Sequence, residues 1–298
     1  MAVVFMAVMP IVAQHADCNG QHECCKNKQT VLTGDDAVAW AKDHVGQLID
    51  NYLASAGNKL DPDELRKQLA PIGYDGTNVP DYRAAEKWLV DTVYRRMMQT
   101  AIANGNRSIT LLTGPGASGK STTTKKLDFS KLGLLYDSAF NGYPSLKKAV
   151  DKAVKAGMDD ITVIAFYNDI ETCYKNSINR GKATNRFLGI AYLTNAFRSN
   201  QDKIKMLRNE YPQVKVKAVD NNHNNGGIWV TPEEAEKWDF TIDAETMNHM
   251  LVYVLNEIYQ KHITGNQIKS AAGDVLNVKG ADDLGKMLIQ EIARQLPK

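Results

Sequence analysis

Cysteine is scarce in this sequence and unevenly placed. The 298-residue chain contains four cysteines, of which Cys18, Cys24 and Cys25 lie near its start and Cys173 is isolated in the body. A fold held together by disulfides distributes its cysteines along the chain. The body is therefore expected to fold in a reducing compartment, and the sequence predicts a cytoplasmic protein.

The early cysteines are interspersed with histidines, in the segment "HADCNGQHECC" at 15–25. Cysteine and histidine are zinc-ligand types, but the spacing is irregular and no second ligand pair follows. We expect residues 1–30 to form a flexible, thiol-bearing segment and not a metal site.

The sequence has no apolar run long enough to cross a membrane as a helix. The apolar segment at 1–13, "MAVVFMAVMPIVA", is too short for that. Three interpretations stay open for it: an export signal that lacks its basic lead-in, a buried strand or helix, or a start codon assigned too early, with Met6 or Met9 as the true first residue. Export therefore remains an alternative to the cytoplasm.

A strong excess of one charge is also missing. The 36 Lys and Arg residues nearly balance 34 Asp and Glu, which leaves a formal net charge of +2. Dedicated nucleic-acid binders usually carry a large basic excess, so this class is not expected, although a local basic patch around a phosphorylated ligand is compatible with the balance. With 43% apolar and 23% charged residues, the composition is that of an ordinary globular protein.

The first part of the body, residues 31–105, is predicted to be helical. Apolar residues recur at helical spacing through 38–52, and again through 89–102 in a helix that begins near Asp81. Between them, "DPDELRKQLA" predicts a short helix with Asp61 as its N-cap and Pro62 at its first position. Pro71 and Gly73 end this helix.

After Gly105 the pattern changes to short aliphatic runs separated by helical stretches. Such alternation predicts an α/β fold, with a parallel sheet covered by helices on both faces. The expected strands are 108–114, 132–137, 161–169, 214–220 and 240–243. The expected helices are 144–157, 170–181, 185–210 and 244–262, with a last one inside 268–298. We assign 106–265 to a core domain and 266–298 to a C-terminal helical tail.

The stretch "GPGASGKS" matches the phosphate-binding pattern G-x-x-x-x-G-K-S. Its glycines allow backbone N–H groups to wrap a phosphate, Lys120 supplies a positive charge, and the Ser121 hydroxyl is a Mg²⁺ ligand. An aliphatic strand precedes the pattern and a helix can follow it, which is the context that the motif requires. The sequence therefore predicts a site for ATP and Mg²⁺ in a P-loop NTPase sandwich. The residues expected to hold the nucleotide are Gly114, Pro115, Gly116, Ala117, Ser118, Gly119, Lys120, Ser121 and Thr122.

Two further groups of residues are expected near the γ-phosphate. Asp137 ends the second strand, where it could accept a proton from an attacking hydroxyl or act as the N-cap of the next helix. Arg180, Lys182 and Arg186 form a basic cluster that could neutralise a transferring phosphoryl group. Asp169, at the end of the third strand, is a candidate for water-mediated Mg²⁺ contact and equally for a helix N-cap.

The P-loop, "DSAF" with a nearby proline, and "RGKATNR" together resemble the zeta-toxin family of P-loop kinases over about 105–262. The resemblance implies ATP-dependent phosphorylation of UDP-N-acetylglucosamine and neutralisation by a small helical antitoxin. It also implies that Asp137 is the base, and that Arg180 with Arg186 (or Lys182) contacts ATP.

Three departures from the family pattern lie mainly on the acceptor side. Asn141 stands where the family has arginine, Lys182 stands where arginine is common, and "VDNNHNNGG" at 219–227 replaces an Asp-Arg-x-Gly turn. The kinase class is therefore predicted more firmly than the acceptor. The helices of 31–105 could brace the sheet or, by analogy of architecture, form a built-in antitoxin.

Two alternatives to a sugar-nucleotide kinase stay open. One is a nucleoside, NAD or other metabolite kinase on the same core. The other, of a different class, is a P-loop protein that binds a partner in response to nucleotide.

Overall fold

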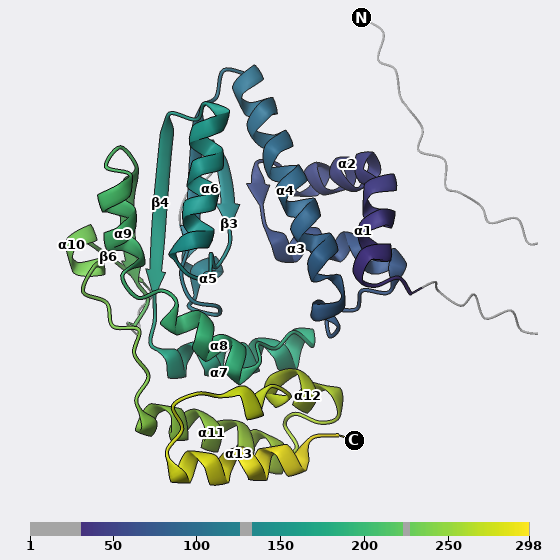
Figure 1. Cartoon of the computed structure of the whole chain (residues 1–298), viewed down its shortest axis with the longest axis vertical. Coiled ribbons are helices and arrows are strands. Elements are labelled where there is room, and N and C mark those ends of the chain that lie inside the picture. Colours follow the sequence, from purple (N-terminus) through teal and green to yellow (C-terminus); the bar gives the residue numbers. More distant parts are fainter. Residues whose placement is uncertain (1–30, 126–132, 223–226, 298) are drawn as a thin grey trace, which may run out of the picture.

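The computed structural model describes residues 31–125, 133–222 and 227–297 of the chain (Figure 1). The expectations for residues 1–30, namely the export signal and the thiol-bearing segment, lie outside the described residues. No described helix is both long and apolar enough to cross a membrane.

A six-stranded sheet forms the centre of the protein, in the order β1-β3-β2-β4-β5-β6. All neighbouring strands are parallel except β5 and β6, which pair in antiparallel orientation. The expected α/β fold with a largely parallel sheet is thus confirmed. The strands are β1 (Lys59–Leu60), β2 (Ser108–Thr113), β3 (Leu134–Asp137), β4 (Asp160–Tyr167), β5 (Lys215–Asp220) and β6 (Ile228–Val230).

The helices surround this sheet. The N-terminal helices are α1 (Gly34–Asp43), α2 (Val45–Ala56), α3 (Pro62–Arg66), the 3-10 helix η1 (Lys67–Ile72) and α4 (Val79–Ala103). The core contains α5 (Lys120–Thr124), α6 (Tyr143–Ala156), α7 (Ile170–Thr184), α8 (Ile190–Arg198), α9 (Lys203–Glu210) and α10 (Pro232–Ala235). The last elements are α11 (Ala244–Tyr259), α12 (Asn266–Ala272), the 3-10 helix η2 (Val275–Asn277) and α13 (Asp283–Gln295).

Two large apolar cores hold the helices in place. The first joins the N-terminal helices and α6 to one face of the sheet, through buried strand residues such as Ile109 and Leu111. The second joins α7 and α8 to α11, α12 and α13, which form the layer at the bottom of Figure 1. Burial of apolar surface at this scale is the main stabilising contribution in a domain of this size.

The region 31–105 is not wholly helical, because it contributes the edge strand β1. Lys59 and Leu60 pair with Leu135 and Tyr136 of β3, and the Leu135 amide donates to the Asn58 carbonyl at 2.9 Å. A two-residue strand has no periodicity of its own, so this pairing was not predictable from a local pattern. The N-terminal region is therefore built into the sheet.

Some local predictions are confirmed and others are wrong. Asp61 caps α3 by accepting from the Asp63 amide at 3.0 Å, with Pro62 at the first helical position. The stretch 240–243 is not a strand; it leads to Asp243, the N-cap of α11. The single helix expected over 185–210 is two helices, α8 and α9, and Asp202 before α9 has a left-handed backbone.

Candidate active site

The glycine-rich loop connects the end of β2 to the start of α5 and has an unusual backbone. Gly114 and Gly119 have positive φ angles of 144° and 87°, and Ala117 between them has a φ of 58°. A Cβ on Gly114 would lie 2.4 Å from the carbonyl oxygen of Phe166 on β4. Glycine is therefore required where the loop leaves the sheet, as the motif predicts.

Lys120 lies folded against its own loop. Its ammonium donates to the carbonyls of Gly114 at 3.2 Å and Pro115 at 3.1 Å. Burial lowers the pKa of this lysine, an effect that the nearby Asp137 carboxylate partly opposes. The cation is thus held at the centre of the loop, next to the residue predicted to be the base.

Asp137 is the last residue of β3 and lies beside Leu112 of β2, two residues before the loop begins. Its side chain is 7% exposed. It is not a helix cap, since α6 begins at Tyr143 with Gly142 as its N-cap. Of the two interpretations left open for Asp137, the N-cap is wrong.

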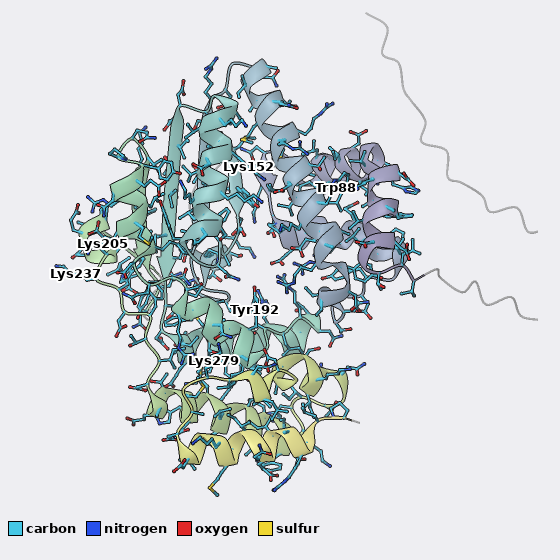
Figure 2. The ribbon with its side chains drawn as sticks, in the orientation of Figure 1. Trp88, Lys152, Tyr192, Lys205, Lys237 and Lys279 are labelled. Atoms are coloured by element: carbon cyan, nitrogen blue, oxygen red, sulfur yellow. The ribbon has the colours of Figure 1, made fainter. Side chains whose placement is uncertain are left out.

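A cleft of about 1440 Å³ lies between the loop, the N-terminal helices and α6 to α8. Figure 2 shows Tyr192 of α8 on the side of that helix that faces the N-terminal helices, and this residue lines the cleft. The predicted site residues that line it are Gly116, Ala117, Ser118, Gly119, Lys120, Ser121, Thr122, Asp137, Arg180 and Arg186.

The two arginines differ in their partners. Arg186 forms an ion pair with Asp63 of α3. Arg180 has a buried Nε without a hydrogen-bond partner among the described residues. Burial, and then the charge of Arg186, lowers the pKa of Arg180. Arg180 is therefore the cation of this pair that is available to an anion in the cleft.

The helix that carries Arg180 is longer than the stretch 170–181 predicted from the sequence. α7 continues to Thr184 and ends at Asn185, which has a left-handed backbone with a φ of 55°. Gly181 makes room for the Phe187 ring, which a Cβ would approach to 2.3 Å. The glycine is needed for close packing next to Arg186.

Several predicted site residues do not line the cleft. Lys182 forms an ion pair with Glu257 of α11 at 2.5 Å. Asp169 caps α7, accepting from the Thr172 amide at 2.7 Å, so the N-cap alternative is confirmed for it. Gly114 and Pro115 belong to the loop, but they are absent from the cleft lining.

Sequence reasoning missed the contribution of the N-terminal region to this site. The Lys59 ammonium lies 3.0 Å from Asp137 Oδ2, and Asp63 pairs with both Arg186 and Arg66. Despite burial, the guanidinium of Arg186, with those of Arg66 and Arg180, holds the pKa of Asp63 below its usual value. No motif marks these residues. The pairing of β1 with β3 places Lys59 beside Asp137, and α3 carries Asp63 and Arg66 to the cleft.

Among the described residues, no group of three or more His, Cys, Asp or Glu side chains could hold a metal ion. Mg²⁺ on a nucleotide needs only one or two protein oxygens in addition to phosphate and water. Ser121 lines the cleft and has an exposed side chain. It therefore fits the role of that single ligand, whereas Asp169, the cap of α7, does not line the cleft.

Comparison with known proteins adds a structural likeness. No protein-family model matches the chain, and the search of curated proteins found no match. A solved structure from the PezAT chromosomal toxin–antitoxin system of the human pathogen Streptococcus pneumoniae is similar over 90% of this chain and 86% of that chain, with 13% identity and a TM-score of 0.35. A likeness at this level assigns neither a family nor an activity, so the function is argued from the residues of the cleft.

Proposed function

We propose that the protein is an ATP-dependent kinase that transfers the γ-phosphoryl group to a hydroxyl of a small molecule. The observation that carries this proposal is that Lys120 and Asp137 line one cleft, at the carboxyl ends of the neighbouring parallel strands β2 and β3. Ligands of open α/β sheets bind at this end of the strands. A phosphate-binding lysine and a carboxylate base are two of the groups that kinases use for phosphoryl transfer to a hydroxyl.

The cleft has unsatisfied polar groups that suit an anionic ligand. Ser118 Oγ and Arg180 Nε are buried without a hydrogen-bond partner among the described residues, although buried polar groups are normally paired. Among the residues that the structure describes, Lys120 donates only to neutral carbonyls of its own loop. A phosphate oxygen can replace these with a stronger, charge-assisted contact. These features support triphosphate binding at the loop.

In the proposed reaction, the oxygen of the acceptor hydroxyl bonds to the γ-phosphorus, and Asp137 accepts the proton of that hydroxyl. The bond from the γ-phosphorus to the β–γ bridging oxygen breaks, and ADP leaves. Lys120 stabilises the charge on the phosphate oxygens, and Arg180, with Arg186 once it is released from Asp63, neutralises the transferring group. Bound Mg²⁺, for which Ser121 is the proposed ligand, would further offset negative charge on the phosphates.

For the acceptor, we propose a sugar nucleotide, the class implied by the sequence resemblance. The cleft of about 1440 Å³ exceeds the ~300–1,000 Å³ of a typical small-molecule site, which leaves room for a second ligand beside ATP. The wall beyond Asp137 includes Asn141, whose amide donates to the Tyr192 hydroxyl at 2.8 Å. These two side chains are the proposed contacts on the acceptor side.

The test uses γ-labelled ATP with Mg²⁺ and a panel of sugar nucleotides, nucleosides and dinucleotides. Asp137→Asn should lower transfer about 10²–10⁴-fold, the usual contribution of a general base, while ATP affinity stays within about threefold. Asp160→Asn, a carboxylate at the opposite, amino end of the parallel strand β4, is the matched control and should transfer like the wild type.

Two results would overturn the kinase proposal. One is that no acceptor in the panel takes label from the wild type. The other is that Asp137→Asn transfers as fast as Asp160→Asn. Binding of ATP that alters affinity for a protein partner, without label transfer, would favour the nucleotide-switch alternative.

We further propose a toxin role, with an antitoxin protein as partner, on the basis of the sequence resemblance alone. Expression of the full chain in a bacterial host should then arrest growth. Lys120→Ala and Asp137→Asn should each relieve the arrest at equal expression. Arrest by all three chains alike would show that it does not depend on phosphoryl transfer.

A further inference from the structure

A buried lysine lies behind the phosphate-binding loop and has no role in the reaction proposed above. Lys203, the first residue of α9, is 2% exposed. No carboxylate among the described residues forms an ion pair with its ammonium, and a buried charge without such a partner is costly. Burial accordingly lowers its pKa well below the usual value, with a smaller contribution from the charge of Lys120.

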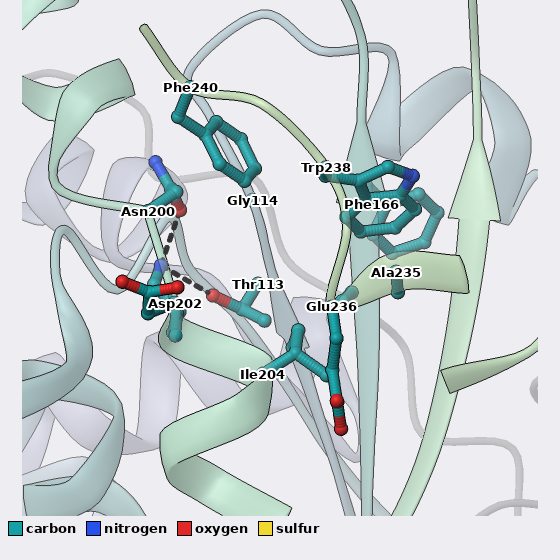
Figure 3. Close-up of a pocket in the computed structure, with 12 residues that line it drawn as sticks. Thr113, Gly114, Phe166, Asn200, Asp202, Ile204, Ala235, Glu236, Trp238 and Phe240 are labelled. Atoms are coloured by element: carbon teal, nitrogen blue, oxygen red, sulfur yellow. Dashed lines mark hydrogen bonds between the residues drawn. The ribbon is translucent and has the colours of Figure 1, made fainter. Parts of the chain in front are cut away.

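Neutral oxygens surround this ammonium. Lys203 Nζ donates to the Phe140 carbonyl at 2.6 Å, to the Thr113 hydroxyl at 3.1 Å and to the Ala139 carbonyl at 3.4 Å. A fourth acceptor is the side-chain oxygen of Asn200. In Figure 3, dashed lines mark the contacts of this ammonium with Thr113 and Asn200.

These acceptors come from the two segments that carry the proposed site. Thr113 is the last residue of β2, directly before the loop, and its hydroxyl donates to the Ala139 carbonyl at 3.1 Å. The Gly114 amide donates to the same carbonyl at 3.4 Å. Ala139 and Phe140 follow Asp137 by two and three residues. Lys203 therefore joins the start of the loop to the segment that holds the proposed catalytic carboxylate.

The backbone is strained on both sides of this junction. Phe140 and Asp202 have positive φ angles of 42° and 57°, which non-glycine residues rarely adopt. Such conformations persist where surrounding contacts enforce them, and they concentrate at functional sites. The contact of Lys203 with the Phe140 carbonyl is one such enforcing contact, and Lys203 itself follows Asp202.

We propose that Lys203 is a positioning residue for phosphoryl transfer: its buried ammonium fixes residues 138–140 against the end of β2 and so sets the place of Asp137 relative to Lys120. This inference rests on the proposed function. It explains why an unpaired cation is kept in the interior, where an apolar side chain would be less costly. Misplacement of a catalytic group by about 1 Å can lower turnover about 10²-fold.

The test compares Lys203→Met with Lys205→Met. The first keeps a long unbranched side chain but removes the amino group that donates the hydrogen bonds, and the second changes an exposed position on the same helix. Each full-length protein is assayed for ATP·Mg²⁺ affinity, for ATP turnover with water or a labelled panel acceptor, and for amide hydrogen exchange. Lys203→Met should lower turnover at least about tenfold while the affinity stays within about threefold. Exchange should rise in peptides that cover 134–142 and stay unchanged in those of α11 and α13.

The outcomes separate this inference from the proposed function. Equal turnover in the two variants, or a fall in affinity and turnover together with a rise in exchange along the whole chain, would overturn the positioning role. If the wild type binds ATP but never turns it over, the proposed function fails, and the inference, which rests on it, fails too. The exchange pattern then still reports whether Lys203 holds residues 138–140.

If Lys203→Met does not fold, Thr113→Val takes its place. It removes only the hydroxyl between Lys203 and Ala139, at a site that is 1% exposed. A smaller loss of turnover with the same local exchange pattern supports the proposal, and wild-type turnover overturns it.

Discussion

The ammonium of Lys59 lies 3.0 Å from the carboxylate of Asp137, and this contact ties the N-terminal region to the proposed catalytic base. The lysine also lies 3.1 Å from Asp61, the cap of α3. Because Lys59 belongs to the edge strand β1, the same backbone pairing that completes the sheet places a cation beside Asp137. The N-terminal region is thus part of the site as well as a support for the sheet.

Replacing Lys59 with methionine should destabilise the protein by about 1–2 kcal/mol near neutral pH. The reason is that Asp137, at 7% exposure, would lose its ion-pair partner, while the partial exposure of Lys59 limits the effect. Chemical unfolding of the two proteins at pH 7 measures the difference. Lys67→Met, at an exposed ion pair with Glu64, is the control and should change stability by less than about 0.5 kcal/mol.

The Lys59 contribution should also depend on pH in a defined direction. Burial alone would lower the pKa of Lys59, but the carboxylates of Asp137 and Asp61 raise it overall above the usual 10.5. A group whose pKa is higher in the folded than in the unfolded protein contributes its full stabilisation at pH values below the unfolded-state pKa. That contribution is lost as the pH rises through the folded-state pKa. The gap between wild type and Lys59→Met should therefore persist to about pH 10 and shrink above it. A gap that shrank on acidification from pH 9 to 6 would contradict this assignment.

Asp63→Asn should remove acid-sensitive stability. The arginines around Asp63 lower its pKa from the usual 3.8, so its ion pairs stabilise the fold above that pH and are lost as the pH falls through the folded value. At pH 7 and pH 5, the free energy of unfolding should be higher for the wild type than for Asp63→Asn. At pH 3 this difference should be smaller. Asp50→Asn, at an exposed position in the interior of α2, should show a much smaller trend, and a gap that widened toward pH 3 would be the contrary result.

The parts of this structure that the sequence predicted well depend on local pattern. The capped start of α3 at Asp61 and Pro62 needs only neighbouring residues, and β2 with the loop after it is marked by an aliphatic run followed by a motif. The placement of Asp137 near the loop followed from the general rule for parallel sheets, and the register confirms it. Each of these inferences uses a signal within a short window.

The missed parts depend on contacts between distant segments. Lys59 and Asp137 are far apart in the sequence, and nothing in a two-residue strand marks its partner. Lys182 has the right type and position in the basic cluster, yet its side of α7 faces Glu257 on α11. Helical periodicity marks the buried stripe of α7, but it does not show which distant residue an exposed lysine outside that stripe will contact.

Gly181→Ala should impair both stability and transfer. An added methyl group would lie 2.3 Å from the Phe187 ring, so the segment that carries Arg186 must shift, at a cost of about 1–3 kcal/mol for an overpacked site. Unfolding experiments and the labelled-ATP assay measure the two effects. Gly46→Ala provides the control, because its added methyl group would have nothing within 4 Å in the first turn of α2. It should not lower the stability of the protein.

Asp274→Ala should weaken the acceptor side of the cleft from the C-terminal tail. The Asp274 carboxylate accepts from the backbone amides of Ala191 at 3.2 Å and Tyr192 at 2.8 Å, so it caps the start of α8 from a distant segment. Loss of a cap costs about 1 kcal/mol. Because Tyr192 is half of the proposed acceptor contact, the KM for the acceptor should rise more than the KM for ATP.

Steady-state kinetics with each substrate varied in turn would measure this difference. The matched control is Asp283→Ala, a carboxylate in the first turn of α13 whose side chain is 99% exposed, and it should leave both KM values unchanged. Equal rises in the two KM values would mean that the cap acts on the cleft as a whole. An unchanged acceptor KM, with stability lowered, would restrict Asp274 to holding α8 and would remove Tyr192 from the acceptor site.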